Sequence, residues 1–274
     1  MRENRLRQLL RAHKPSIATR ISSRWGLITE LAAYGKCYDY IEYLAEYAPL
    51  QVEDFENLAR TCELHGMGSI VKVDFQNRFW TAQKALAAGI QGVLFTDCKT
   101  PAEVEECIYM TMPDTPEYGG RFGYPSYRWI GYQPNKPQLD YARMAAESVR
   151  LFMIEKKEAV DHIEEICRIP GVDMIQFGPS DYSMSCGRNA ADPDWIDCRR
   201  EAERHCIRVA LEHGVEPRCE IERVQDAAYY RELGVKHFCL GDQVKILRNW
   251  WSENGTQLRN MLQTDTLPAP QAEP

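Results

Sequence analysis

Eight short apolar segments alternate with longer amphipathic segments along most of this 274-residue chain. The apolar segments predict strands at residues 16–20, 37–44, 68–74, 92–97, 149–155, 173–178, 216–221 and 237–242. The segments between them predict helices that end in glycine, as many helices do (52–66, 79–89 and 227–234). Strands that are apolar along most of their length indicate a parallel sheet covered on both faces. Eight such units in roughly 250 residues predict a (β/α)8 TIM barrel.

A doubly wound open sheet is the alternative fold, because it is built from the same strand–helix units. It usually carries a Gly-rich phosphate loop after its first strand, and no such loop follows residues 16–20. We therefore expect a single barrel over residues 1–263 and a disordered tail at 264–274.

Two further segments stand out from this pattern. Residues 112–137 are rich in Gly, Pro and Tyr and are too long for an ordinary connection. Long loops in compact domains are often functional, although a plain surface excursion is the alternative. The last predicted helix, at 244–262, carries Trp250 and Trp251, which suggests an apolar face that packs against a neighbouring subunit.

Charge and cysteine usage narrow the class of protein. A net charge of −7 argues against a nucleic-acid partner, since no basic face is present to neutralise phosphates. No apolar run reaches the roughly 20 residues that span a bilayer, and the charged N-terminal segment does not resemble a signal peptide. Ten cysteines without a C-x-x-C pair favour reduced thiols over disulfides or structural zinc. We expect a soluble, cytoplasmic protein.

Polar residues gather at the predicted C-terminal ends of the strands, where a TIM barrel carries its active site. They are Glu46, Tyr47, Lys72, Asp74, Asp97, Glu155, Asp181, Glu220, Glu222 and Asp242. The alternative is that acids at strand ends cap the next helix without a catalytic role. We take that alternative as the default for every acid except Glu155 and Asp181.

Glu155 and Asp181 end two neighbouring predicted strands, so their carboxylates are expected to converge. Two carboxylates at a water-accessible site without His or Cys suit a hard cation such as Mg²⁺ or Mn²⁺. Around Asp181 the chain reads FGPSDYSMS. Gly178 lets the backbone approach a ligand, and Pro179 stiffens the turn. Ser180 and Asp181 then present backbone N–H groups to an anion.

Three stretches of the chain form recognisable motifs. FMIEKKEAV (152–160) is an apolar strand ending in Glu, GVDMIQFGPSDYSMSCG (171–187) contains a Gly-Pro-x-Asp-x-Ser pattern, and AEYAP (45–49) lies near the N-terminus. Together they resemble the metal-dependent pyruvate aldolases of the 4-hydroxy-2-oxoheptanedioate aldolase family (HpcH/HpaI aldolase/citrate lyase). The likeness covers residues 5–262.

The resemblance implies a barrel of the phosphoenolpyruvate/pyruvate-binding type, assembled as a hexamer of three dimers that exchange their C-terminal helices. It implies a divalent cation, Mg²⁺ or Mn²⁺, held by Glu155 and Asp181. That cation would chelate the keto oxygen and carboxylate of pyruvate or a related 2-oxo acid. Backbone amides near Ser180, beside Gly178 and Pro179, are expected to hold the substrate carboxylate.

Three positions depart from the family pattern. Tyr47 stands where the family has its catalytic His, and Ala87 stands where that His has its acidic partner. Lys72 replaces the Arg that stabilises the enolate oxygen; Lys keeps the charge but loses the bidentate fork. None of the six histidines is an evident replacement for the missing base.

We therefore predict a divalent-metal-dependent carbon–carbon lyase of the aldolase type, acting on the enolate of a 2-oxo acid. Lys72 is the candidate cation for the enolate oxygen. The base is Tyr47, whose pKa would have to fall from about 10, or a metal-bound hydroxide. The long loop contains a Gly-Arg-x-Gly segment that resembles the one the family has near its site. Arg121 in this segment, or Arg128, is the candidate ligand of a distal carboxylate, with a solvated arginine as the alternative.

Three alternatives stay open. Lys72 could form a Schiff base with a keto substrate, as in metal-free aldolases. The barrel could run a non-aldol lyase or synthase reaction on a 2-oxo acid. It could also bind a 2-oxo acid without turning it over, since the base, its partner and the Arg are all altered.

Overall fold

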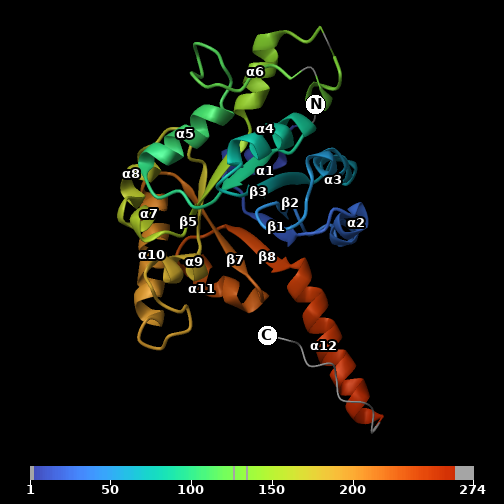
Figure 1. Ribbon diagram of the computed structural model, residues 1–274, viewed down its shortest axis with the longest axis vertical. Helices are drawn as coiled ribbons and strands as arrows, with labels where there is room; N and C mark the ends of the chain where they lie inside the picture. Colours follow the sequence, from blue (N-terminus) through green and yellow to red (C-terminus); the bar gives the residue numbers. More distant parts are fainter. Residues whose placement is uncertain (1–2, 126, 134, 263–274) are drawn as a thin grey trace.

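The computed structural model describes residues 3–125, 127–133 and 135–262, and it confirms the predicted TIM barrel. Eight parallel strands close in chain order, with β8 pairing back onto β1 (Figure 1). The strands are β1 (Ser16–Ile21), β2 (Tyr40–Leu44), β3 (Gly68–Val73), β4 (Gly92–Phe95), β5 (Val149–Ile154), β6 (Met174–Phe177), β7 (Glu216–Ile221) and β8 (His237–Asp242). Each overlaps one of the eight predicted segments.

Helices between the strands surround the barrel, and one further helix precedes β1 and another follows β8 (Figure 1). They are α1 (Arg5–Arg11), α2 (Gly26–Tyr34), α3 (Val52–Leu64), α4 (Arg78–Ala88), α5 (Pro101–Thr111), α6 (Gln138–Ala146), α7 (Lys157–Asp161), α8 (Ile163–Arg168), α9 (Pro179–Ser185), α10 (Ile196–Glu212), α11 (Ala227–Glu232) and α12 (Gln243–Met261). Helices α3, α4 and α11 end just before Gly66, Gly89 and Gly234. These glycines have φ of 72°, 108° and 93°, the left-handed region that glycine adopts without strain.

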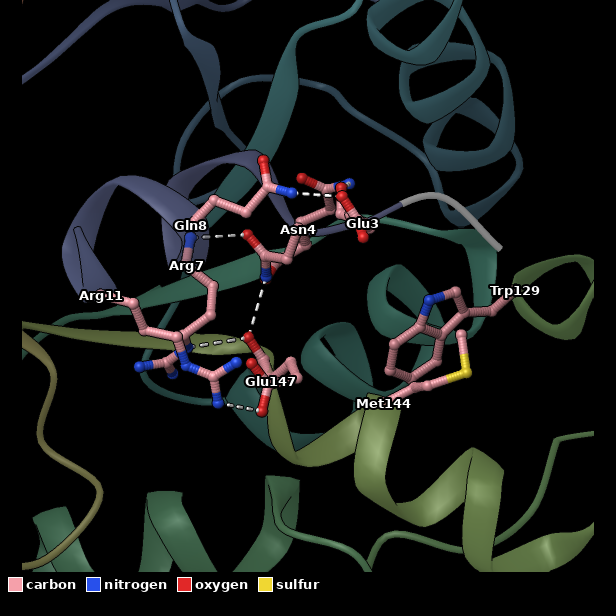
Figure 2. A pocket seen from close by; sticks show the side chains of 9 residues that line it. Glu3, Asn4, Arg7, Gln8, Arg11, Trp129, Met144 and Glu147 are labelled. Carbon is pink, nitrogen blue, oxygen red and sulfur yellow. Dashed lines mark hydrogen bonds and ion pairs between the residues drawn. The ribbon is translucent and has the colours of Figure 1, made fainter. Parts of the chain in front are cut away.

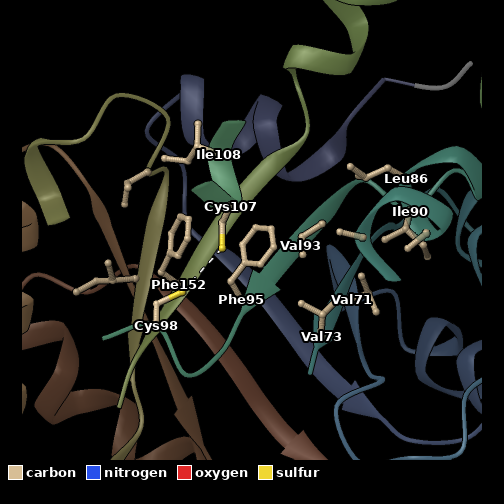
Figure 3. Packing of buried hydrophobic residues seen from close by; sticks show 14 of the residues in the cluster. Val71, Val73, Leu86, Ile90, Val93, Phe95, Cys98, Cys107, Ile108 and Phe152 are labelled. Atoms are coloured by element: carbon tan, nitrogen blue, oxygen red, sulfur yellow. Dashed lines mark hydrogen bonds between the residues drawn. The ribbon is translucent and has the colours of Figure 1, made fainter. Parts of the chain in front are cut away.

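The main hydrophobic core lies between the sheet and its surrounding helices. In the part drawn in Figure 3, Phe95 of β4 stacks on Phe152 of β5 with ring centroids 5.3 Å apart. Cys98 and Cys107 are buried beside these rings, with their sulfur atoms 3.9 Å apart. All ten cysteines are unpaired, and the buried thiols act as small hydrophobic groups.

The inside of the barrel combines an apolar cluster with an ionic one. Leu6 and Leu10 of α1 belong to the apolar cluster, so α1 closes the N-terminal end of the barrel. In the ionic cluster, Glu42 of β2 is fully buried between Arg20 of β1 and Arg218 of β7. Its carboxylate accepts a 2.7 Å hydrogen bond from Arg20 Nε and lies 2.5 Å from Arg218 Nη2. These contacts join β1, β2 and β7 inside the barrel.

Burial on its own would raise the pKa of Glu42, but Arg20 and then Arg218 outweigh it and lower the pKa to about 2. The carboxylate is therefore ionised over the whole range in which proteins are handled. A buried ion pair of this kind is costly to break from one side, because the remaining charge stays in the interior without a partner.

The long segment 112–137 follows α5 and precedes α6, so it lies at the N-terminal end of the barrel. Its aromatic rings pack on each other and on α6: Trp129 lies 6.3 Å from Phe122 and 5.6 Å from Tyr141, measured between ring centroids. These contacts show that the aromatic rings of this segment pack against each other and against α6.

Helix α12 projects away from the barrel and has no buried residue (Figure 1). Among the described residues, no helix combines the length and the apolar character needed to cross a membrane. The tail predicted to be disordered, residues 264–274, lies outside the described part of the chain.

Candidate active site

Charged side chains from five consecutive strand ends meet at the C-terminal end of the barrel. They are Glu46 after β2, Lys72 on β3, Asp97 after β4, Glu155 and Lys156 after β5, and Asp181 in α9 after β6. Lys72 pairs with Glu46, and Lys156 pairs with Asp97 and Asp181. A backbone hydrogen bond joins Asp97 to Glu155. The closed parallel barrel brings these residues together, because it aligns the C-terminal ends of all its strands on one face.

Glu155 directly follows the apolar strand β5 and is only 2% exposed. Its Oε1 atom accepts a 3.0 Å hydrogen bond from the backbone N–H of Asp97. Burial raises the pKa of Glu155 to about 7, opposed by the nearby charge of Lys72 and by the Asp97 N–H. Lys72 and the Asp97 N–H do not fully offset the cost of burying the ionised Glu155 carboxylate. A bound cation would stabilise this ionised form.

Gly178 follows β6 and leaves space for the side chain of Glu155. A Cβ at this position would lie 2.6 Å from the Cβ of Glu155 and 2.7 Å from its Oε2, closer than such atoms approach. The φ of Gly178 is −108°, so the requirement for glycine is one of space rather than of backbone conformation. The space predicted at Gly178 for a ligand is thus bordered by the side chain of Glu155.

Asp181 lies in the first turn of α9, which starts at Pro179. Its carboxylate is 36% exposed and faces the Lys156 ammonium at 3.8 Å. The N–H groups of Ser180 and Asp181 lie in the turn where a helix has no preceding carbonyl to accept from them. At such a position a backbone N–H can donate to an acceptor outside the helix.

Lys72 is nearly buried on β3, and its ammonium is 2.6 Å from Glu46 Oε2. Glu46 is itself almost buried, so the pair is largely removed from water. Glu46 is the first residue of the segment EYAP, next to Tyr47. Sequence reasoning named both Lys72 and Glu46 but did not pair them.

Tyr47 is largely exposed, with 76% of its surface accessible. Partial desolvation and the carboxylates of Glu46, Asp181 and Asp97 raise its pKa well above the usual value for tyrosine. Lys72 contacts Glu46 and does not offset this rise. Tyr47 therefore lies at the site as a protonated phenol at neutral pH.

Asp97 and Lys156 form an ion pair of 2.5 Å beside Glu155. Asp97 has a φ of 59°, an unusual left-handed conformation for a residue other than glycine. From the sequence, Asp97 was expected to cap the next helix. The only indication in the sequence that Asp97 and Lys156 would pair is that they follow neighbouring strands, β4 and β5.

The other acids at strand ends have local roles, but only Asp242 caps a helix as the default interpretation expected. Asp74 accepts from the Asn77 N–H at 2.8 Å, and Asp242 accepts from the Lys245 N–H at 3.1 Å. Glu222 pairs with the side chain of Lys245. Glu220 pairs with Arg20 of the ionic cluster.

Arg121 lies at the opposite end of the barrel from Glu155. It follows α5, whose C-terminus faces the N-terminal ends of the strands, and its backbone N–H donates to Tyr109 O at 2.8 Å. Within one chain, Arg121 is thus not brought to the candidate site. Its predicted role as a substrate ligand requires a second copy of the chain.

A cavity of about 230 Å³ lies at this N-terminal end, between α1 and α6 (Figure 2). Its arginines are already paired: Arg7 with Asp173 at 2.6 Å and Arg11 with Glu147 at 2.7 Å. The cavity is separate from the strand ends that carry Glu155 and Asp181, so it is not a competing active site for the same chemistry.

Within the described residues, no group of three or more His, Cys, Asp or Glu side chains is arranged to hold a metal ion. The candidate site offers two carboxylates, Glu155 and Asp181. Mg²⁺ is commonly bound in proteins by one or two carboxylates while it keeps several waters. The donor set is thus compatible with such a cation and unsuited to a fully protein-enclosed metal.

Comparison with known proteins gives a consistent family assignment. The family described as HpcH/HpaI aldolase/citrate lyase matches residues 47–240, more than half of the chain. The 4-hydroxy-2-oxo-heptane-1,7-dioate aldolase of Escherichia coli is 24% identical over 251 residues, which cover 89% of this chain and 91% of the relative.

Solved structures share the same barrel. An HpcH/HpaI aldolase from Desulfitobacterium hafniense DCB-2 superposes with a TM-score of 0.83 at 19% identity, covering 98% of this chain and 99% of the other. The citrate synthase SbnG gives 0.78 at 25% identity, with coverage of 93% and 98%. CitE from Mycobacterium tuberculosis, in complex with magnesium and pyruvate, gives 0.54 at 12% identity, with coverage of 84% and 86%. The chain therefore belongs to the HpcH/HpaI aldolase/citrate lyase family, which confirms the prediction of a carbon–carbon lyase.

Proposed function

We propose that this chain is a divalent-cation-dependent lyase that forms or uses the enolate of pyruvate or a related 2-oxo acid. The observation that carries the proposal is the placement of Glu155 and Asp181 at neighbouring strand ends, with Lys72 close enough to Glu155 to act on its pKa. The complex of CitE with magnesium and pyruvate supports this combination of cation and substrate for the family.

The charges of the site favour a divalent cation. Its carboxylates are Glu46, Asp97, Glu155 and Asp181, and its ammonium groups are Lys72 and Lys156. With all six groups ionised, two negative charges remain, which Mg²⁺ or Mn²⁺ would neutralise. The space that Gly178 leaves beside Glu155 fits the same interpretation, because it allows a buried carboxylate to face the ligand.

A cation held by Glu155 and Asp181 would bind the keto oxygen and carboxylate of the substrate and stabilise the enolate as a Lewis acid. Lys72 supplies a second positive charge at the oxygen on which negative charge develops. Ser180 and Asp181 offer backbone N–H groups to the substrate carboxylate, and Gly178 and Pro179 shape that turn.

Tyr47 is suited to donate a proton rather than to accept one. Because its surroundings raise its pKa, the phenol is protonated at neutral pH. In the direction of carbon–carbon bond formation, the carbonyl oxygen of the acceptor must take up a proton, and a neutral phenol can supply it. This favours a synthase reaction as the second candidate, in which the chain joins the enolate to an electrophile.

The ion pair of Lys72 with Glu46 supports a role for Lys72 as a cation. A Schiff base requires a neutral amine, whereas this pair requires the ammonium form. Borohydride trapping with pyruvate should therefore leave Lys72 unmodified. A covalent adduct on Lys72 would replace the cation mechanism with the metal-free one.

Exchange of the methyl protons of pyruvate tests the proposed enolate chemistry. We expect deuterium to enter the methyl group in D₂O when Mg²⁺ is present, measured by loss of the proton NMR signal. The exchange should stop when the cation is chelated and in Asp181→Asn, which loses one ligand carboxylate. The matched control Asp161→Asn changes an exposed acid paired with Lys157 and should exchange normally. Pyruvate that binds without any cation-dependent exchange would favour the binding-only barrel.

We also propose that the chain assembles through α12, as the family resemblance implies for a hexamer of dimers. Trp250, Trp251, Leu258 and Met261 are each more than half exposed on this projecting helix. An isolated chain rarely leaves so many large apolar side chains in water, so a second copy is the expected cover. Arg121, at the far end of its own barrel, would also need a second copy of the chain to reach a substrate.

Replacing both tryptophans of α12 with glutamate should dissociate the assembly. We expect wild-type protein to have a mass in solution that is a multiple of 31.6 kDa, and Trp250→Glu/Trp251→Glu to approach 31.6 kDa. Light scattering after size-exclusion chromatography measures both. Glu253→Gln on the same helix is the control and should leave the mass unchanged. A wild-type monomer at micromolar concentration would refute assembly through α12.

The ten unpaired cysteines support a reducing compartment, and we propose the cytoplasm. Cys37 and Cys198 are exposed, where an oxidising environment would readily modify them.

A further inference from the structure

Lys156 bridges two carboxylates that follow different strands, Asp97 after β4 and Asp181 after β6. Its ammonium is 2.5 Å from Asp97 Oδ1 and 3.8 Å from Asp181 Oδ1, and only 13% of its side chain is exposed. The next residue, Lys157, behaves differently: its side chain is 60% exposed and pairs with Asp161 in its own helix. Two adjacent lysines thus have distinct environments, and only Lys156 is directed into the candidate site.

Asp97 holds this lysine and the buried carboxylate together. Its side chain binds Lys156, while its backbone N–H donates to Glu155 Oε1. The turn that carries Asp97 is tied to β3, since Thr96 Oγ1 donates to Val73 O at 2.9 Å. Asp97 keeps its left-handed backbone (φ 59°) inside these contacts. The position of Lys156 is therefore set by a well-anchored turn.

For Asp181 this arrangement has a direct consequence. Within the described part of the chain, Lys156 is the only side chain that makes an ion pair or hydrogen bond with the Asp181 carboxylate. A positive charge of the protein itself therefore lies next to a proposed cation ligand. A divalent cation that binds Asp181 must share this carboxylate with the ammonium or displace it onto Asp97.

We propose that Lys156, anchored by Asp97, is a tethered cation that weakens binding of the divalent cation alone and strengthens binding of the anionic substrate. This inference rests on the proposed function. In the presence of Lys156, the six charged groups of the site carry two negative charges, which one divalent cation neutralises. The carboxylate of a 2-oxo acid then meets a site that still contains two ammonium groups. Because of Lys156, the cation is therefore bound more tightly when the substrate is also bound.

Without the Lys156 charge the balance shifts in two opposite directions. The site becomes more negative by one charge, so a divalent cation is attracted more strongly and an anionic substrate less strongly. Unit charges a few ångströms apart near a protein surface interact strongly enough to change each of these binding affinities on the order of tenfold. A side chain with a purely structural role would behave differently, since its loss would weaken both ligands together.

The test is a titration of the intact protein with Mn²⁺, followed by electron paramagnetic resonance of the free ion, first without and then with pyruvate. Lys156→Met is expected to tighten Mn²⁺ binding about tenfold and to weaken pyruvate binding to the Mn²⁺-loaded protein by a similar factor. Asp97→Asn removes a negative charge and frees Lys156 to face Asp181, so it should weaken Mn²⁺ binding. Lys157→Met should change neither.

The outcomes separate this inference from the function on which it rests. If wild-type protein binds no divalent cation, the proposed function and the role of Lys156 are both refuted. If wild-type protein binds Mn²⁺ but Lys156→Met leaves the affinity unchanged or lowers it, the role of Lys156 alone is refuted. Melting curves of each variant without cation show whether a loss of folding explains a loss of binding, and Lys156→Arg should restore both affinities toward wild type.

Discussion

Replacing Glu155 with glutamine is expected to stabilise the cation-free protein and, at the same time, to abolish its response to Mg²⁺. Burial raises the pKa of Glu155 from 4.5 to about 7. Above that pH, the ionised carboxylate lowers the free energy of unfolding by roughly 3 kcal/mol. Glutamine has nearly the same shape, can still accept from the Asp97 N–H, and removes the charge. The melting temperature at about pH 8 should rise by several degrees, because each kcal/mol of added unfolding free energy raises it by about 2–4 °C.

The pH dependence gives this prediction a definite sign. A carboxylate whose pKa is raised on folding gives its full stability below the unfolded pKa of about 4.5 and loses it as the pH rises through about 7. The stabilising effect of Glu155→Gln should thus be largest near pH 8 and vanish near about pH 4.5. Thermal melts of both proteins in a chelator across this range measure it.

Added Mg²⁺ should reverse the order of stability. Wild-type protein gains stability from a ligand that binds only the folded state, whereas Glu155→Gln gains none. Its cation-dependent methyl exchange should fall by roughly a thousandfold, since Lewis-acid stabilisation is worth several kcal/mol. Asp181→Asn is the matched control: it should lose the response to Mg²⁺ without becoming more stable, because Asp181 is partly exposed. A lower melting temperature for Glu155→Gln in the chelator would contradict the buried, poorly compensated carboxylate.

Replacing Glu42 with leucine is expected to be strongly destabilising. Arg218, only 1% exposed, would lose the carboxylate 2.5 Å away and remain charged in the barrel interior. Removing one partner from a buried pair typically costs about 3–5 kcal/mol, which corresponds to a fall of roughly 10 °C in melting temperature. Chemical and thermal denaturation measure the loss, and the methyl-exchange rate of the protein that remains folded shows whether the site survives.

Two companion variants identify the cause. Glu42→Leu/Arg218→Met removes both charges and should recover most of the lost stability, since a buried pair is often replaceable by apolar residues. Glu220→Gln alters the exposed partner of Arg20, with 27% of its side chain accessible, and should cost less than about 1 kcal/mol. If Glu42→Leu is no more harmful than Glu220→Gln, the ionic cluster does not stabilise the barrel.

Much of the fold was predictable because strand and helix patterns are local. The periodic apolar segments placed all eight strands, and the glycines after α3, α4 and α11 marked helix ends where a left-handed residue is needed. The ends of β2 and β4 were less accurate: the chain is predicted as strand from residue 37 and to residue 97, but pairing covers Tyr40–Leu44 and Gly92–Phe95. Hydrogen bonds with neighbouring strands set these limits, and they depend on register.

The ionic cluster of Glu42, Arg20 and Arg218 was not predicted. These residues lie within strands that otherwise read as apolar, and Arg218 is almost 180 residues away from its partner on β2. In the sequence, the only indication of this cluster is the presence of isolated charged residues inside apolar segments. Such charges also occur at strand edges that face water, so sequence alone does not distinguish the two situations.

The sequence by itself determined the barrel, the family and the two acids proposed to hold a cation, because strand periodicity and the motifs around Glu155 and Asp181 are contained in short stretches of chain. The tertiary structure alone decided which charges face each other. It paired Lys72 with Glu46 and Lys156 with Asp97, raised the pKa of Tyr47, and placed Arg121 at the far end of the barrel. These outcomes depend on which strand ends become neighbours and how deeply each side chain is buried, and both arise only when the barrel closes.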